Sequence, residues 1–439
     1  MIYLLSFLTV LLLILIYVIE KDVISPSFIF CLVFMIAEFN VISNITKLGV
    51  KFRVDTVLVV FLGIFIFFVG TILANLAPKC VGKRKKNIRT LDLTKPKQVF
   101  LCIFNIVSII YILKNVYILV VQRAGYVGGI LGSLSVFAEV SKFQSIDMKL
   151  DTVSTLLTAL CEAEAYIFGY IIASKLVKKE KIEIITLICF ITSFLSTFCQ
   201  GSRGGVFIII ASVFCFIIIY RKEKGIKIIG LKLIFKLIGV IILAIVAFQI
   251  IGTMTGKMWD VSVYEYFSVY LGDPLINLDT KLSNGIERTK ISGQASFGGL
   301  IKNIFGKLGI YVPKYGALGE FQYYGNHNLG NVYTIFAYLI ADFGILGCWI
   351  ACFIIGIIVE FIYIRTIKNK KNNDEFMTIL CGYIMSSVAF SFFSNKICEN
   401  VTIYHIYMFL FVFIIINFLT KKGDKYSIVQ NKECENELD

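Results

Sequence analysis

The chain has 439 residues, of which 58% are apolar and only 16% are charged. A soluble domain of this size cannot bury so much apolar surface, so the composition excludes an ordinary soluble protein. The net charge of +14 comes largely from basic residues in short connectors between apolar runs, which argues against nucleic-acid binding.

Recurring apolar runs approach the roughly 20 residues that a helix needs to cross a bilayer. The first run has no basic residue ahead of it and no small-residue cleavage site, so we expect it to remain as a span. The alternation typical of membrane barrels is absent. We predict an all-α, polytopic helical bundle of about eleven spans, near residues 2–19, 26–42, 55–77, 99–120, 152–174, 183–199, 205–220, 237–252, 344–364, 376–394 and 401–419.

The basic connectors follow alternate spans, as the positive-inside rule requires. Eleven spans then place the N-terminus outside and the C-terminus in the cytoplasm. The predicted organisation is spans one to eight over 1–252, a large extracytoplasmic loop over 253–330, spans nine to eleven over 331–420, and a cytoplasmic tail over 421–439.

Two outer segments are candidates for function. In the first, residues 131–143 are half apolar, which predicts a helix at the membrane interface. The second is the long loop, which is rich in Tyr and Gly and carries Trp259. Because loops of this length are uncommon unless they are functional or disordered, we interpret it as an ordered cap.

Residues 200–205 read QGSRGG and lie between the sixth and seventh predicted spans. Ser202 suits the N-cap of a helix that begins near Gly204, and the glycines leave backbone N–H groups accessible. A helix N-terminus beside the Arg203 guanidinium favours an anion such as a phosphate. The alternative is that Arg203 only extends to the membrane interface.

Residues 325–331, at the end of the long loop, read GNHNLGN. His327 is one of two histidines, and an imidazole near its ordinary pKa can take a proton from a sugar hydroxyl. Asn326 and Asn328 are candidates for holding sugar hydroxyls. A loop histidine bonded to the backbone is the alternative.

Three further residues of the long loop are candidate substrate contacts. Arg288 and Lys290 are cations suited to a diphosphate, and Glu320 could orient His327 or bind a sugar. Arg288 and Lys290 could equally be solvated. We expect Asp342 to open the ninth span in a structural role, and His405, within an apolar run, to be a packing residue with one satisfied nitrogen.

The fifth span contains Glu162 and Glu164, and a carboxylate within a bilayer usually has a partner or a function. Lys114 in the fourth span is a candidate partner. The two glutamates are two residues apart and therefore cannot easily share a helix face.

No motif predicts a metal or a cofactor. D-x-D is missing from the predicted outer segments, C-x-x-C, P-loop and G-x-S-x-G motifs are absent, and the twelve cysteines lie mostly within spans.

The chain resembles the Wzy-type oligosaccharide repeat-unit polymerases of O-antigen and capsular polysaccharides. The resemblance is carried by the number of spans, SRGG opening a span at residues 202–205, the large outer loop, and His327 leading into NVYT at 331–334 and ADFGILG at 341–347. These motifs cover about thirty residues, and Ser-Arg-Gly is also found in O-antigen ligases.

The resemblance implies a glycosyltransferase of the bacterial plasma membrane. It would move a glycan from undecaprenyl diphosphate to another lipid-linked repeat unit, with Arg203 and Arg288 on the diphosphate and His327 as the base. The implied partners are the lipid-linked oligosaccharide, membrane lipid, a chain-length regulator and a flippase.

Two alternatives remain open. An O-antigen-type ligase would use the same donor and a different acceptor. A lipid-linked oligosaccharide flippase or other transporter would need a polar path, for which Glu162, Glu164 and Lys114 are the candidates.

Overall fold

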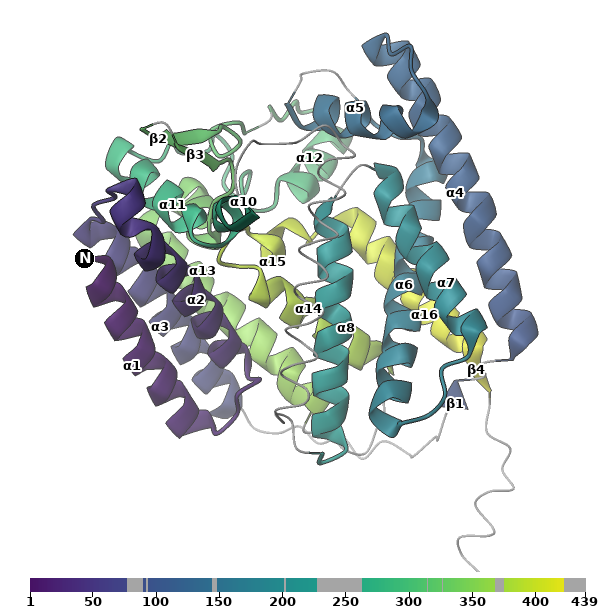
Figure 1. The fold of residues 1–439 in the computed structure, drawn as a ribbon, viewed down its shortest axis with the longest axis horizontal. Helices are drawn as coiled ribbons and strands as arrows, with labels where there is room; N and C mark the ends of the chain where they lie inside the picture. Colours follow the sequence, from purple (N-terminus) through teal and green to yellow (C-terminus); the bar gives the residue numbers. More distant parts are fainter. Residues whose placement is uncertain are drawn as a thin grey trace, which may run out of the picture.

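The computed structural model describes residues 1–76, 90–91, 94–143, 148–200, 203–226, 263–313, 315–325, 327–367 and 375–421. Within these ranges the chain is almost entirely helical, which confirms the all-α fold class (Figure 1). The described strands form two short antiparallel pairs, β1 (Thr90–Leu91) with β4 (Thr420–Lys421) and β2 (Gln322–Tyr324) with β3 (His327–Gly330).

Helices long and apolar enough to cross a membrane account for most of the predicted spans. The described residues contain seven such helices: α1 (Ile2–Glu20), α2 (Pro26–Leu48), α3 (Val54–Leu76), α4 (Lys95–Ala124), α6 (Thr152–Lys178), α8 (Arg203–Glu223) and α13 (Ile335–Ile367). Three shorter apolar helices, α7 (Ile184–Ser196), α14 (Glu375–Ala389) and α16 (Ile403–Leu419), match three more predicted spans. The predicted eighth span, 237–252, lies outside the described residues.

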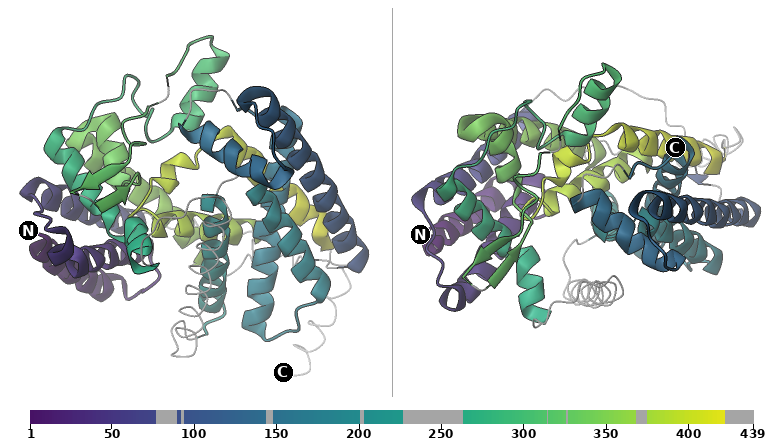
Figure 2. Two further views of the ribbon diagram at one scale, coloured as in Figure 1. Left: turned by 45° about the horizontal axis from the view of Figure 1, so that its top comes forward. Right: turned by 90° about the horizontal axis from the view of Figure 1, so that it is seen from above.

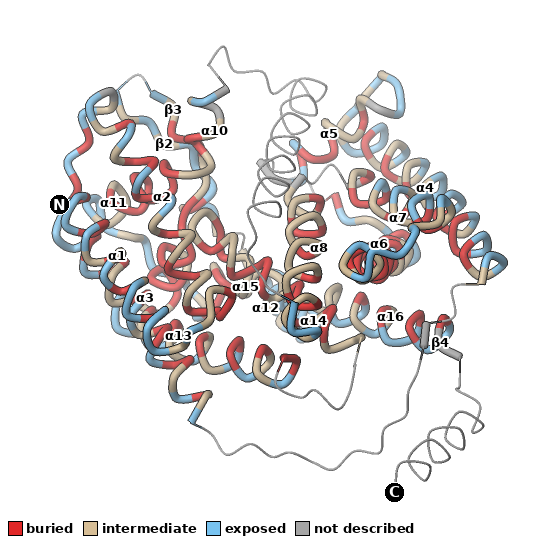
Figure 3. Tube along the Cα trace, turned by 60° about the horizontal axis from the view of Figure 1, so that its bottom comes forward, coloured by how far each residue is buried: buried red, intermediate tan, exposed pale blue. Residues whose placement is uncertain are grey.

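The bundle has two main apolar cores. One is formed mainly by α1, α2, α3 and α13, and the other by α4, α6, α7, α8 and α16, while α14 contributes side chains to both. Seen from above, α1–α3 and α4–α7 lie on opposite sides of the molecule (Figure 2). Buried residues face the interior of each group, and many large apolar residues on the outer helix faces are exposed (Figure 3), as a bilayer environment requires.

Close contact between α3 and α13 holds the first core together. A Cβ added at Gly70 of α3 would overlap the carbonyl oxygen of Phe353, and one added at Gly356 of α13 would overlap that of Phe67. Glycine at both positions lets the two backbones approach directly, which is the usual way in which helices pack in membranes.

Successive described spans alternate in direction, so the ends of the bundle differ, and the cap lies at one of them (Figure 1). The end opposite the cap holds several basic residues near the starts and ends of the spans, among them Lys97, Lys175, Lys178, Arg221, Lys222 and Arg365, whereas Arg123 and Arg203 lie at span ends on the cap side. The distribution agrees with the predicted positive-inside pattern. The orientation in a membrane stays a prediction.

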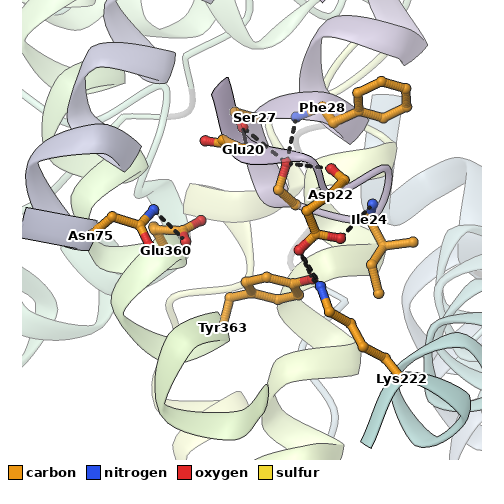
Figure 4. Close-up of polar contacts among 10 residues, drawn as sticks. Glu20, Asp22, Ile24, Ser27, Phe28, Asn75, Lys222, Glu360 and Tyr363 are labelled. Atoms are coloured by element: carbon orange, nitrogen blue, oxygen red, sulfur yellow. Dashed lines mark hydrogen bonds and ion pairs between the residues drawn. The ribbon is translucent and has the colours of Figure 1, made fainter. Parts of the chain in front are cut away.

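A polar cluster joins the two groups of helices at this basic end (Figure 4). Lys222 of α8 forms an ion pair with Asp22 in the α1–α2 turn and donates to the hydroxyl of Tyr363 on α13 at 2.7 Å. The Tyr363 hydroxyl also donates to Asp22, at 2.7 Å. Three segments from different parts of the sequence are thus tied at one point.

The cap comprises the remaining described helices and the β2–β3 hairpin. Its helices are α5 (Ile130–Phe143), α10 (Val263–Leu271), α11 (Asp273–Asn284), α12 (Gly298–Lys307) and the four-residue α15 (Lys396–Glu399). A 3₁₀ turn, η1 (Thr197–Gln200), continues α7 toward α8.

Two elements at this end were predicted from the sequence in part. The helix predicted over 131–143 is present as α5, whose apolar side chains Phe137 and Val140 pack against α4 and η1, while its place at a membrane interface stays a prediction. The ninth span was expected from residue 344, and α13 consists of two helical segments that meet at a break at Gly344, so the second segment begins where the sequence predicts. Asp342 lies just before this break, and a further helical segment from Ile335 precedes it.

We expect Gly70→Ala to lower the melting temperature of the purified protein in detergent. The new methyl group would press on the Phe353 carbonyl, and overpacking of this kind costs about 1–3 kcal/mol. The control is Gly306→Ala in α12, where an added Cβ meets no atom within 4 Å. Equal melting temperatures for both variants would contradict the close packing of α3 on α13.

Candidate functional site

The break in α13 organises the first part of the candidate site. Gly344 has φ 73° and ψ −178°, so the carbonyl groups preceding it lose the regular helical pattern. The amide of Thr289 donates to the Ala341 carbonyl at 3.0 Å, and the Arg288 guanidinium donates to the Asp342 carbonyl at 3.2 Å. A Cβ at Gly344 would overlap that guanidinium, so glycine is required both for its φ and for the space.

The Asp342 carboxylate fixes the loop that carries Arg288. It accepts the Thr289 hydroxyl at 2.9 Å and the amides of Ala295 and Ser296 at 2.9 and 2.7 Å. The residue is only 3% exposed. Hydrogen bonds to a carboxylate are stronger than those between neutral groups, so residues 288–296 are held firmly against α13.

Arg288 lies where the lipid-compatible surface of α13 ends. Beyond the break, α13 exposes an apolar stripe that spans roughly 23 Å at 1.5 Å per residue. The stripe consists of Leu346, Ile350, Ile354, Ile358 and Phe361. Arg288 and Lys290 are both exposed, and Arg288 lies beside Gly344, just past the stripe. A guanidinium at this level is suited to phosphate groups at a membrane surface.

The β2–β3 hairpin forms the second part of the candidate site. His327 is exposed and pairs with Tyr324 across the hairpin, while the Asn328 side chain accepts the Gly330 amide at 2.8 Å. The buried Asn277 of α11 holds the hairpin end by donating to the carbonyls of Leu329 and Val332. His327 is thus presented on an anchored hairpin, whereas Asn328 has a local structural role.

Glu320 lies just before this hairpin and is not bonded to His327 by any contact among the described residues. Its carboxylate pairs with Lys281 of α11 at 3.5 Å and its side chain is 69% exposed. An exposed pair of this kind contributes little to stability, so Glu320 remains accessible to a ligand. Asn326, the other predicted contact in this segment, lies outside the described residues.

The third part is the start of α8. Arg203 is its first residue and Gly204 its second, one residue earlier than the sequence predicts. Ser202, the predicted N-cap, lies outside the described residues. The start of α8 is at the cap end of the bundle, but α8 packs on α6 and α14 whereas the hairpin packs on α10 and α11 (Figure 1). The candidate residues therefore share one end of the molecule without forming one compact cluster.

The buried glutamates have partners other than Lys114, which is exposed on α4. Glu162 accepts the hydroxyls of Tyr404 at 2.6 Å and Tyr166 at 3.4 Å, and Glu164 accepts the Asn105 amide at 2.8 Å. The two carboxylates thus face different neighbouring helices, α16 and α4, as their spacing predicts. The suggested pairing with Lys114 is wrong.

His405 behaves as the packing residue that was expected. Its Nδ1 lies 2.7 Å from the Thr402 hydroxyl, and its ring packs against Tyr383 and Tyr404. His327 is therefore the more accessible of the two histidines.

An ion pair that the sequence analysis missed lies between α14 and α16. Lys396 of α15 contacts Glu399 at 2.6 Å, and the Ser394 hydroxyl also donates to Glu399, at 3.2 Å. Both charged side chains are less than one-third exposed. The signal in the sequence was Lys396 itself, a basic residue in the short connector between two predicted spans.

Comparison with protein-family models, curated proteins and solved structures gives no match to the chain.

We expect Asp342→Ala to accelerate amide hydrogen exchange in residues 288–297. Loss of even one hydrogen bond to a charged group, about 1.5 kcal/mol, corresponds to roughly tenfold faster opening. Exchange mass spectrometry would measure this against Glu320→Ala, which removes an exposed carboxylate of the same cap. Unchanged exchange in the Asp342 variant would show that the carboxylate does not hold the loop.

The cap also contains a buried carboxyl whose titration affects stability. Burial raises the pKa of Asp273, at the start of α11, from 3.8 to about 7. The folded protein then holds a proton that the unfolded chain releases, so this group lowers stability as pH rises from about 4 to about 7. Asp273→Asn should match wild type at the acidic end and melt at a higher temperature at pH values above 7. Identical pH profiles for the two proteins would contradict the shift.

Proposed function

We propose that the protein is a membrane glycosyltransferase that polymerises lipid-linked oligosaccharide repeat units at the outer face of a bacterial plasma membrane. The observation that carries the proposal is Arg288, held against the α13 break at the edge of a lipid-exposed stripe. A diphosphate attached to a polyprenyl chain has its charge at that level and its tail in the bilayer. The resemblance in sequence supplies the reaction.

The proposed reaction transfers the growing glycan to the non-reducing end of another repeat unit. The bond between the sugar C1 and the diphosphate oxygen breaks, and its electron pair leaves with the diphosphate. A new C1–O bond forms to the acceptor hydroxyl, whose proton passes to His327. Arg288 and Arg203 would stabilise the charge that develops on the leaving diphosphate, which is commonly a large contribution to catalysis.

The cap would hold the sugars while the bundle shelters the lipid. The exposed His327 and Glu320 face solvent from an anchored hairpin, and Lys290 lies beside Arg288 in the sequence. Glu162 and Glu164 each accept a hydrogen bond from a neutral side chain on a neighbouring helix, so the polar path that the transporter alternative needs would not include a pairing with Lys114.

We expect Arg203→Lys and Arg288→Lys to reduce polymer formation strongly, because a lysine lacks the two-pronged contact of a guanidinium with phosphate. His327→Ala should lower the rate by about 10²–10⁴, the usual contribution of a general base. Purified variants would be given lipid-linked repeat units alone, and product chain lengths measured. The matched control is Arg123→Lys, an exposed arginine at the same end of the bundle.

Normal polymer from all three variants would exclude the proposed site. Cells lacking the protein distinguish the alternatives. Accumulation of single lipid-linked units on the outer face indicates a polymerase, and accumulation of units on the inner face indicates a flippase. Polymer that is not joined to its final acceptor indicates a ligase.

A further inference from the structure

A buried carboxylate in the second apolar core is only half satisfied by hydrogen bonds. Glu164 of α6 and Asn105 of α4 are both 0% exposed, and the Asn105 amide donates to Glu164 Oε2 at 2.8 Å. The other oxygen of each group, Glu164 Oε1 and Asn105 Oδ1, has no hydrogen-bond partner among the described residues. Because a carboxylate oxygen and an amide oxygen can only accept hydrogen bonds, neither can satisfy the other. The pair therefore lacks a positive partner.

This pair lies between three helices near the middle of the bilayer. Helices α4, α6 and α7 lie side by side (Figure 1). Glu164 is twelve residues past the start of α6 at Thr152, a depth of about 18 Å. The hydrocarbon core is about 30 Å thick, so water cannot be assumed to solvate the two free oxygens.

Serine hydroxyls from the neighbouring helices bring further oxygen atoms to this level. Ser108 of α4 and Ser196 of α7 are 2% and 0% exposed. Both hydroxyls lie beside the Cys161 thiol, which is one turn before Glu164 on α6. Each hydroxyl already donates to a carbonyl of its own helix, at 2.8 and 2.7 Å. Only the lone pairs of these two oxygens are left for another partner.

Helix α7 ends at the same level. Its last residue is Ser196, which lies beside Cys161, so α7 stops within the bilayer and only the 3₁₀ turn η1 continues it. The C-terminus of a helix has a partial negative charge, which favours a cation nearby. In membrane proteins, helices that end near the bilayer midplane commonly coordinate Na⁺ or a proton in this way.

We propose that Glu164, Asn105, Ser108 and Ser196 bind one Na⁺ ion between α4, α6 and α7. Oxygen atoms are the ligands that hard cations prefer. The single carboxylate neutralises a monovalent ion, whereas a divalent ion would leave an uncompensated charge inside the membrane. This inference does not depend on the proposed enzymatic activity, because it concerns only this buried group of side chains.

The test is a melting experiment on the purified full-length protein in detergent, in which NaCl replaces choline chloride at constant ionic strength. An ion that binds only the folded protein raises the melting temperature as its concentration increases. We expect a rise of several degrees that saturates with NaCl, and a much smaller rise when KCl is used instead.

Glu164→Gln should remove the response to Na⁺, because the glutamine amide has no charge and can itself donate to Asn105 Oδ1. The matched control is Glu162→Gln, two residues away on α6, whose carboxylate accepts two tyrosine hydroxyls; this variant should keep the response. Ser196→Ala leaves the carboxylate in place and should raise the NaCl concentration at half effect severalfold. It tests the site even if the Glu164 variant does not fold.

Equal melting temperatures of the wild type in NaCl and KCl would overturn the proposal, as would an unchanged response to Na⁺ in Glu164→Gln or in Ser196→Ala. A wild type whose melting temperature depends on pH but not on Na⁺ would identify a proton as the partner of Glu164, and would also overturn it.

Discussion

A helix that breaks near lipid leaves carbonyl groups that lipid cannot satisfy, and the arrangement at Gly344 depends on how these groups are paired. The carbonyls of Ala341 and Asp342 receive their hydrogen bonds from Thr289 and Arg288, two residues of the cap loop. The Asp342 carboxylate then ties down the rest of that loop. The break at Gly344 thereby fixes the position of the Arg288 guanidinium along the bundle and the point at which α12 begins.

The cap is attached in two different ways. Residues 288–296 are bound to α13 at the edge of its lipid-exposed stripe, whereas the β2–β3 hairpin is bound to α11 through Asn277. In the proposed reaction the first attachment would set the position of the diphosphate and the second that of the proton acceptor. Because the attacking hydroxyl and the leaving diphosphate meet at the same C1 atom, the proposed reaction requires Arg288 and His327 to act around one reacting centre.

The spans were predictable because the length of an apolar run is a local property set by the bilayer. The break in α13 was not, since it depends on Asp342 meeting amides at Ala295 and Ser296, far away in the sequence. The same limit applies to α5, because only tertiary packing reveals that Phe137 and Val140 are covered. Among the site residues, the charge of Arg288 made it a candidate. Its hydrogen-bond partner, the Asp342 carbonyl, could not be predicted from the sequence.

The length of α16 has a consequence for the surrounding bilayer. Its 17 residues span only about 25 Å, whereas a typical hydrocarbon core is about 30 Å thick. Because the helix faces outward along much of its length, lipid beside it must be compressed or the helix ends must lie below the headgroups. Such hydrophobic mismatch favours local thinning of the bilayer along this flank of the protein.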